Sequence, residues 1–306
     1  MKSFATRLVL LFSTLCLWTS AQAQPGGSAC PPEPKSQHFG YFVQVGANAD
    51  VGGAKNDKKD ELTCWVAGPS KSGQDRLQSH GQYADFTSEY SYTVGPAGIS
   101  ASARVYGQVH SVKDGSGGGH ADLWLMWHDT LTFHSNKRTQ VTSGDFYKGT
   151  PNRQDLAAGS TIRVKVRLLQ SPPQCSGASN EFTYKTGVMA AFLSVLSGGN
   201  VTAPGRIPTN EKGEVINGNN WFIRADKCGI PNGFQIVDVP NGYGLAIRIS
   251  VNAETLGNID HGKTQEGHLK VELSDMRVCV VHPDKSSDLE SDLTITSASG
   301  ADYWCP

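Results

Sequence analysis

The sequence predicts an all-β protein, an antiparallel β-sandwich of the jelly-roll kind, and three observations lead to this fold class. The 306 residues include 34 glycines and 15 prolines but only four methionines, so turn formers are abundant and helix formers are scarce. Short runs of alternating apolar and polar residues recur along the chain, with the two-residue period of a half-buried strand. No helical pattern alternates with these runs, as a parallel α/β fold would require.

Two neighbouring runs show the alternation most clearly. Residues 99–109 carry small and apolar side chains at odd positions and polar ones at even positions. Residues 121–133 repeat this arrangement, interrupted on the apolar face by Asp129. Between them, residues 113–119 read KDGSGGG, a loop that no helix would tolerate. The two runs therefore predict a long hairpin.

The register of this hairpin follows if the two apolar faces must coincide, because a slip of one residue would turn every side chain of one strand over. Placing Val112 opposite His120 satisfies the condition. The predicted cross-strand pairs are then His110 with Asp122, Gln108 with Trp124, Tyr106 with Met126, and Arg104 with His128.

Later parts of the chain predict further strands. They lie at residues 161–168, 245–251, 269–273, 276–281 and 293–296. Residues 182–196 are ambiguous, because their alanines and leucines permit a helix whereas Thr183, Tyr184 and Val188 favour a strand. We predict a strand there.

The N-terminus has the three parts of a secretory signal peptide. Lys2 and Arg7 precede an apolar run over residues 8–18, and a small-x-small cleavage site ends at Ala23. The run has 11 residues, whereas a spanning helix needs roughly 20, so an uncleaved membrane anchor is disfavoured. We expect 1–23 to be removed, 24–40 to form an extended arm, 41–306 to form one large sandwich, and the product to be released outside the cytoplasm, either extracellular or periplasmic.

Cysteine usage agrees with export, because six cysteines remain after cleavage and disulfides persist in oxidising compartments. Six cysteines allow 15 pairings, and the sequence does not choose among them. The sequential set would close three loops of modest length: Cys30–Cys64, Cys175–Cys228 and Cys279–Cys305. A zinc site is disfavoured, because no pair has C-x2-C spacing.

Charge and motifs exclude several classes of function. The formal net charge of −1 provides no field that would attract nucleic acid. The chain has no H-E-x-x-H motif, and residues 68–73 resemble a nucleophile elbow only in composition, since the serine spacing is wrong. Acidic loops at residues 57–61 and 114–116 lack the regular spacing of a calcium loop. We expect neither a cofactor nor a metal, and the oligomeric state is left open.

Two segments resemble bacterial exported β-sandwich proteins of the kind that often carry a PEP-CTERM sorting tail. They are the strand leading into WHDTLTF at residues 127–133 and the segment at residues 289–303, which ends LTITSASGADY. The resemblance implies export and a sandwich fold, but no activity. The sequence ends Trp304-Cys305-Pro306 without a Val-Pro-Glu-Pro motif, so membrane-anchored sorting is not expected. In a bacterial protein the sequon at Asn200 would usually go unused.

The polar face of the predicted hairpin is the candidate binding surface. It would place six side chains in one band: Arg104, Tyr106, His110, Asp122, Trp124 and His128. Aromatic faces stack on sugars while polar neighbours bind hydroxyls, so a glycan is the expected ligand. The alternatives are a buried second layer containing Trp124, or a histidine–carboxylate pair used in catalysis. Asp129, a lone acid on an apolar face, is expected to be hydrogen-bonded at a bulge or corner.

These observations favour an exported, non-catalytic protein that binds a glycan or another surface polymer, or that acts as an extracellular structural component. The alternative is a secreted polysaccharide-active hydrolase or lyase with a jelly-roll fold. Two carboxylates close together beside Trp124 and Tyr106 in a groove would favour the enzyme. A flat strip without paired acids would favour binding.

Overall fold

The computed structural model confirms the all-β sandwich. It describes residues 39–52, 56–111, 113–140, 159–169, 174–197, 200–201, 233–242, 244–263 and 266–306. Every regular element in these ranges is a β-strand. Residues 32–306 form one compact unit. The predicted signal peptide and the predicted arm up to residue 38 lie outside the described residues.

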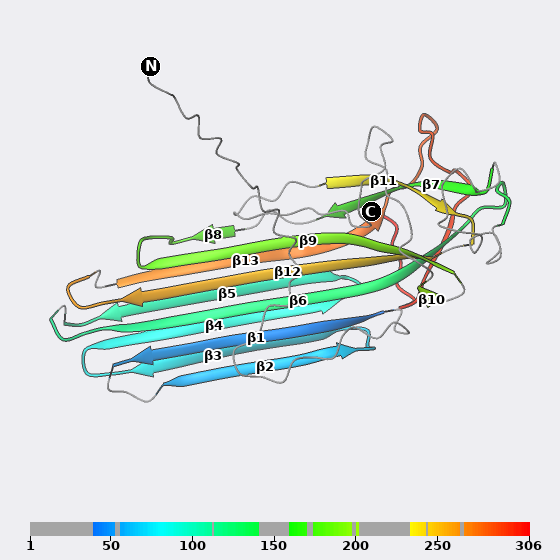
Figure 1. The fold of residues 1–306 in the computed structure, drawn as a ribbon. Coiled ribbons are helices and arrows are strands. Elements are labelled where there is room, and N and C mark those ends of the chain that lie inside the picture. The colour runs from blue at the N-terminus through cyan, green and yellow to red at the C-terminus, as the bar shows by residue number, and fades with distance from the viewer. Residues whose placement is uncertain are drawn as a thin grey trace, which may run out of the picture. The chain divides into compact units, whose positions relative to one another are not determined.

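Two antiparallel sheets make up the fold (Figure 1). The first sheet has the order β10 (Asn200–Val201), β9 (Phe182–Ser197), β12 (Gly244–Ile259), β6 (Gly117–His134), β1 (Gly40–Val51) and β2 (Asp57–Val66), and β14 (Thr294–Ser297) pairs with β6. The second has the order β11 (Gly233–Pro240), β7 (Thr161–Leu169), β13 (Glu266–Val280), β5 (Gly98–Val109), β4 (Ala84–Gly95) and β3 (Lys71–His80), and β8 (Gln174–Ser176) pairs with β13.

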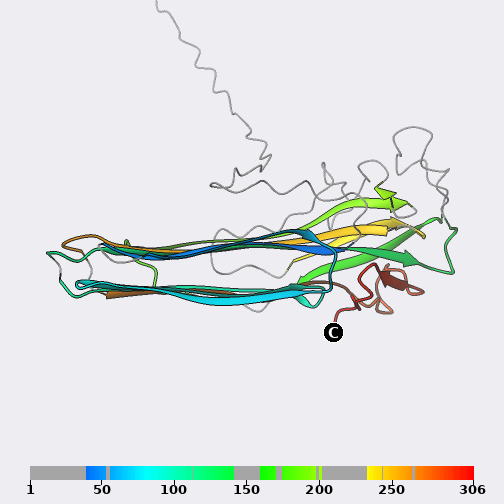
Figure 2. The ribbon, with the colours of Figure 1, turned by 90° about the horizontal axis from the view of Figure 1, so that it is seen from below.

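The core lies between the inner faces of the two sheets, which form separate layers in Figure 2. The alternation in the sequence sets these faces, since every second side chain of a strand points the same way. Val45 of β1 and Leu123 of β6 are fully buried in the first sheet, and Ala103 and Val105 of β5 are fully buried in the second. The intervening residues face outward; on the second sheet these are mostly polar, whereas the first sheet also carries aromatic residues there.

Glycines allow the two sheets to approach closely near the start of β6. A Cβ atom at Gly119 would lie 2.8 Å from Ser88 Oγ and 2.9 Å from Val105 Cγ1, both on the opposite sheet. The hydroxyl of Ser88 also donates a hydrogen bond across the layers to the Asn48 carbonyl oxygen at 2.5 Å. The glycine-rich run in the sequence is therefore required by packing as well as by the turn.

The predicted hairpin is wrong, because β5 and β6 belong to different sheets. β5 pairs with β4 and β13, while β6 pairs with β1, β12 and β14. The connecting segment arches from one layer to the other, so the two apolar faces oppose each other across the core. Alternation shows which side of a strand is buried, but it does not show which strand is its neighbour. A glycine-rich loop can connect two neighbouring strands of one sheet or two strands of opposite sheets.

Several other strand predictions are confirmed. The strand at 161–168 is β7, that at 245–251 is the first half of β12, that at 293–296 matches β14, and the ambiguous stretch 182–196 is β9. The strands predicted at 269–273 and 276–281 are instead one strand, β13, whose register shifts between Leu273 and Met276. Asp275 has φ 54° at this bulge, a left-handed conformation that an aspartate tolerates better than most residues.

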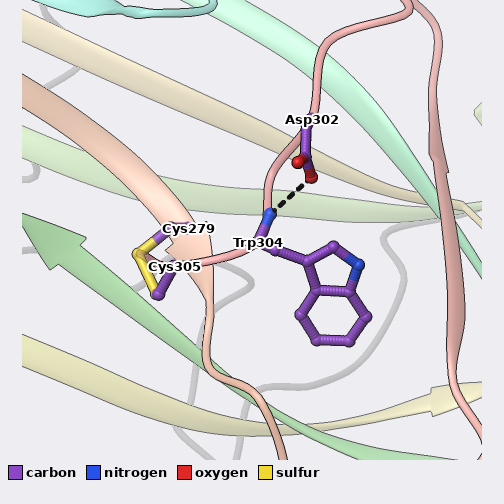
Figure 3. The surroundings of a disulfide bond; sticks show 4 residues. All are labelled: Cys279, Asp302, Trp304 and Cys305. Carbon is purple, nitrogen blue, oxygen red and sulfur yellow. Dashed lines mark hydrogen bonds between the residues drawn. A yellow bond between two sulfur atoms is a disulfide. The ribbon is translucent and has the colours of Figure 1, made fainter.

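One of the three predicted disulfides is confirmed, between Cys279 and Cys305, which are 26 residues apart with Cα atoms at 4.9 Å (Figure 3). Cys64 and Cys175 are also disulfide-bonded. Their predicted partners, Cys30 and Cys228, lie outside the described residues. Beside the confirmed disulfide, the Trp304 amide donates to Asp302 Oδ1 at 2.9 Å. The disulfide thus ties the last residues of the chain to β13.

Asp129 is fully buried and hydrogen-bonded, as its position on an apolar face predicted. Oδ1 accepts from the Thr130 amide at 2.7 Å and the Ser299 amide at 3.2 Å. Oδ2 accepts from the Ser299 hydroxyl and from the Tyr303 hydroxyl, the latter at 2.8 Å. Of the predicted bulge or corner, β6 has no bulge here, because Asp129 pairs with Ile247 in unbroken register; the pairing of β6 with β1 ends at His128 and its pairing with β14 begins at Leu131. This carboxylate holds the C-terminal segment against β6.

Candidate functional site

The six predicted site residues divide between the two outer faces of the sandwich. The outer face of the second sheet carries Arg104 and Tyr106 of β5, with His110 directly after the strand. The other three, Asp122, Trp124 and His128, lie on β6 and face outward from the first sheet. The arch between β5 and β6 causes this separation, so the predicted single band does not exist. Each face has to be considered as a site of its own.

The outer face of the second sheet is a regular polar grid. Its cross-strand rows over β3, β4, β5 and β13 are Gln74–Ser91–Ser102–Glu272, Arg76–Glu89–Arg104–Lys270, Gln78–Thr87–Tyr106–His268 and His80–Asp85–Gln108–Glu266, with Ser72–Thr93–Ser100 beyond them. Directly opposite residues in neighbouring antiparallel strands have Cβ atoms about 5 Å apart, so these side chains are in contact range.

Three adjoining hollows lie over this grid, and we call them together the polar trough. The first is lined by Ser72, Gly73, Gln74, Ser91, Tyr92, Thr93, Ser100, Ala101, Ser102, Glu272, Leu273 and Ser274. The second is lined by Gln74, Asp75, Arg76, Glu89, Tyr90, Ser91, Ser102, Arg104 and Lys270, and the third by Arg76, Thr87, Glu89, Arg104 and Tyr106. The hollows arise where short serine and threonine side chains stand beside long charged ones.

Ion pairs organise the centre of the trough. Glu89 accepts from Arg76 Nε at 3.2 Å and from Arg104 Nη1 at 3.5 Å. In the neighbouring strand Lys270 pairs with Glu272. These contacts fix the long side chains in place over the sheet, so that they form the walls between hollows.

Tyr106 is the one tyrosine in the grid rows, while Tyr90 and Tyr92 line the other two hollows. Burial and the neighbouring Glu266 carboxylate raise the pKa of its phenol, so the hydroxyl keeps its proton at neutral pH. It donates to Gln108 Oε1 at 3.2 Å. The ring is half-buried and lines one end of the trough.

His110 has a different partner from the one predicted. Its Nε2 lies 2.6 Å from Asp85 Oδ2, and His80 Nδ1 lies 2.9 Å from Asp85 Oδ1. Partial burial tends to raise the pKa of Asp85, but the hydrogen bonds from His110 and His80 have the larger combined effect. The pKa of Asp85 is therefore lowered. No group of three acidic, histidine or cysteine residues in the described part of the chain is arranged to hold a metal ion.

The outer face of the first sheet carries an aromatic cluster. The Phe42 ring lies 5.1 Å from Trp124 and 6.0 Å from Trp65, measured between centroids. Trp65 in turn covers His128, with centroids 4.9 Å apart, and Arg248 approaches the Trp65 ring at 5.2 Å. Burial lowers the pKa of the Arg248 guanidinium to about 10.

This cluster is largely closed by its own packing. Phe42 and His128 each keep 5% of their surface exposed, and Met126 keeps 8%. Trp124 is intermediate, and its indole nitrogen donates to Ser250 Oγ at 3.1 Å. The prediction that Trp124 and His128 form an open sugar-binding strip therefore has weaker geometric support than the corresponding prediction for Arg104 and Tyr106.

Asp122 faces a second carboxylate instead of His110. Its cross-strand neighbour on β12 is Glu254, and its Oδ1 accepts from Asn252 Nδ2 at 3.2 Å. Burial and the Glu254 charge raise the pKa of Asp122. His120, whose Nε2 lies 3.8 Å from Glu254 Oε1, and the cation of Lys185 lower the pKa of Glu254 despite its partial burial. Two adjacent acids thus differ in their tendency to hold a proton.

Sequence reasoning missed the residues that β3, β4 and β13 contribute to the trough, including Arg76, Glu89 and Lys270. The sequence did contain a signal for the β4 residues. The odd positions from 85 to 93 are polar (Asp, Thr, Glu, Ser and Thr), and they alternate with buried neighbours. That pattern marks an outward polar face, but only the sheet order brings it beside Arg104.

No protein family model, curated protein or solved structure matches this chain. The resemblance to exported proteins with a sorting tail therefore stays a prediction from residues 127–133 and 289–303. Among the described residues, no helix is long and apolar enough to cross a membrane.

Proposed function

We propose that this chain is an exported, non-catalytic β-sandwich protein that binds a glycan in the polar trough of the second sheet. The observation that carries the proposal is the continuity of three hollows across four strands, lined by hydroxyl, amide and charged groups. Export is supported by the signal-like residues 1–23 and by the disulfides.

The chemistry of the trough suits a sugar polymer. Sugar hydroxyls both donate and accept hydrogen bonds, and serine and threonine hydroxyls with a glutamine amide offer both functions. Ser91, Ser102 and Gln74 lie side by side in one cross-strand row. The Tyr106 ring at the end of the trough supplies an apolar face for stacking. A trough that follows the strands matches a linear ligand better than a compact one.

The test is retention of the mature chain by a glycan array and by immobilised polysaccharides. Ser102→Trp would fill the middle of the trough without removing a charge, and we expect it to weaken binding at least about tenfold. Thr183→Trp is the matched control, because Thr183 is exposed on the outer face of the other sheet. Absence of glycan binding by the wild type, or full binding by Ser102→Trp, would refute the proposal.

A second candidate is a secreted polysaccharide-active hydrolase or lyase. The Asp122–Glu254 pair favours it, because acid/base catalysis uses neighbouring carboxylates whose pKa values are pushed apart. Trp124 lies two residues from Asp122 on the same face, but Tyr106 is on the opposite face, so the predicted groove between them does not form.

Reducing-end release and the ultraviolet absorbance of unsaturated products measure the two enzymatic reactions. An enzyme should lose this activity in Asp122→Asn and keep it in Asp60→Asn, a change at an exposed acid in the same row. If the wild type neither binds nor cleaves any polysaccharide, an extracellular structural role is the function left.

A further inference from the structure

We infer that the glycan is anionic, a linear polysaccharide whose carboxylate groups contact Arg76, Arg104 and Lys270. This inference rests on the proposed function of the polar trough and names the class of its ligand. Three features of the second sheet carry it: a row of cations, the exposure of their charged ends, and the placing of hollows on both sides of that row.

The three cations lie in one cross-strand row over β3, β5 and β13, with Glu89 between the two arginines. The row itself holds three positive charges and one negative charge, and Glu272 of the adjoining row, which pairs with Lys270, adds a second negative charge. Asp75 also borders this region, and its carboxylate lies 3.9 Å from Lys59. Lys59 offsets Asp75, so the row and Glu272 together keep one positive charge in excess.

Exposure favours an anion as well. The side chains of Arg76, Arg104 and Lys270 are 62%, 50% and 42% exposed, whereas those of Glu89 and Glu272 are 31% and 34% exposed. Glu89 and Glu272 therefore lie nearer the sheet than the three cations do, whereas Asp75, whose side chain is 45% exposed, lies beside Lys59. A ligand approaching the trough meets guanidinium and ammonium groups first.

Arginine geometry adds specificity for carboxylate. A guanidinium has five N–H donors arranged as a fork, and two of them can bind one carboxylate side by side. The contact of Arg104 with Glu89 uses Nη1 alone, at a long 3.5 Å. This contact leaves the other donors of the Arg104 guanidinium for a ligand, and the cross-strand partner of Arg104 on β13 is a second cation, Lys270.

The hollows on either side of the row suit a polymer with acidic groups along its length. The second and third hollows share Arg76, Glu89 and Arg104, so the charged row forms the ridge between them. Sugar rings would occupy the hollows while a carboxylate contacts the ridge. From Thr87 to Thr93 along β4 the trough extends roughly 20 Å, given a rise of about 3.3 Å per residue.

The experiment compares polygalacturonate and alginate with their carboxylates either free or esterified, using the full mature chain and calorimetry. The polymer backbone is the same in each pair, so only the charge differs. We expect the free-carboxylate form of at least one polymer to bind at least about tenfold more tightly at low salt, and this preference to shrink as salt screens the charges.

Two variants locate the effect. Arg104→Gln should reduce affinity for the free-carboxylate polymer about fivefold to tenfold and leave the esterified polymer unaffected. Lys185→Gln is the control, because Lys185 is an exposed cation paired with a glutamate on the other sheet, 3.2 Å from Glu254. Circular dichroism and thermal unfolding check that both variants fold.

The outcomes separate the two proposals. If free and esterified polymers bind equally, or only neutral glycans bind, the proposal of an anionic ligand is refuted. If Ser102→Trp still abolishes that binding, the proposal that a glycan binds in the trough is retained. Carboxylate preference that survives Arg104→Gln but falls in Lys185→Gln would overturn the location. If no glycan of any charge binds the wild type, the proposed function fails and this inference fails with it.

Discussion

Replacing Tyr303 with phenylalanine tests how the C-terminal segment is held to the sandwich. The hydroxyl of Tyr303 donates to Asp129 Oδ2 at 2.8 Å and accepts from the indole nitrogen of Trp127 at 3.2 Å. Tyr303 is 4% exposed, Trp127 is 1% exposed, and Asp129 is fully buried. Tyr303→Phe keeps the ring and removes only the oxygen that joins these two groups.

The expected loss follows from what the variant leaves behind. A hydrogen bond to a charged group contributes about 1.5–3 kcal/mol, and a buried donor without a partner costs about 1–3 kcal/mol. Asp129 keeps three donors in the variant, so part of this cost is recovered by relaxation. We therefore expect Tyr303→Phe to lower the free energy of unfolding by about 3 kcal/mol, which for a domain of this size lowers Tm by roughly 6–12 °C.

Urea unfolding of the oxidised mature chain, followed by tryptophan fluorescence and circular dichroism, measures this change. Tyr106→Phe is the matched control, because its hydroxyl bonds Gln108 on a half-exposed surface, and it should change stability by less than about 0.5 kcal/mol. Equal midpoints for Tyr303→Phe and Tyr106→Phe, with unchanged slopes, would refute the view that Asp129 and Tyr303 anchor the C-terminus.

Three further changes probe the disulfide, the packing and the charges. Cys279→Ser with Cys305→Ser opens a loop of 26 residues and should cost about 3.5 kcal/mol in urea unfolding, less if the reduced chain keeps residual structure. Gly119→Ala, whose Cβ would lie 2.8 Å from a side chain of the other sheet, should destabilise by about 1–3 kcal/mol more than Gly118→Ala, whose nearest neighbour is a carbonyl oxygen at 3.3 Å. Asp122→Asn should raise stability at pH 7, because the pKa of Asp122 is raised in the folded protein, and should give no gain at pH 3.

The sign of the last prediction follows from proton linkage. Burial and Glu254 raise the pKa of Asp122 in the folded protein, so the folded state binds a proton there more tightly than the unfolded chain. The wild type therefore loses stability as pH rises from about 4, the unfolded value, through the raised pKa. An asparagine carries no such charge. A stability difference that is the same at pH 3 and pH 7 would contradict this reasoning.

The fold class could be predicted because it depends on local patterns. The alternation in residues 99–109 and 161–168 is a property of the strand itself, and composition excluded helices as the main element. Residues 182–196 form a strand, so their β-branched and aromatic residues were a better guide than the helix formers around them.

The neighbours of each strand could not be predicted in the same way. The faces of β5 and β6 were assigned correctly, and both lie in the core, yet their relation was predicted as side by side and is face to face. Both arrangements bury the same side chains, so hydrophobic patterning gives no reason to choose one. The difference depends on long-range pairing with β4 and β12, whose sequences carry no signature for their partners.

The wrong pairing of β5 with β6 also affected the predicted site, whose residues lie on two different faces. Arg104 and Tyr106 were chosen because they alternate with buried residues, and they do line a hollow. Their companions Glu89 and Lys270 come from strands about 15 and 166 residues away in the chain. His110 was expected beside an aspartate and does contact one, but that residue is Asp85.

The two outer faces of the sandwich differ more in how exposed their side chains are to a ligand than in which residue types they carry. The first sheet carries more aromatic surface, but Trp65 covers His128 and Phe42 fills the space beside Trp124, so the rings largely satisfy one another. On the second sheet the tall side chains are charged and remain 42–62% exposed, and the spaces between them are open. A ligand that displaces water from a polar face must replace the hydrogen bonds which that face made with water. A polymer rich in hydroxyl and carboxylate groups can do this, and an apolar ligand cannot. This contrast is what favours the trough, and not the aromatic cluster, as the surface where binding should first be sought.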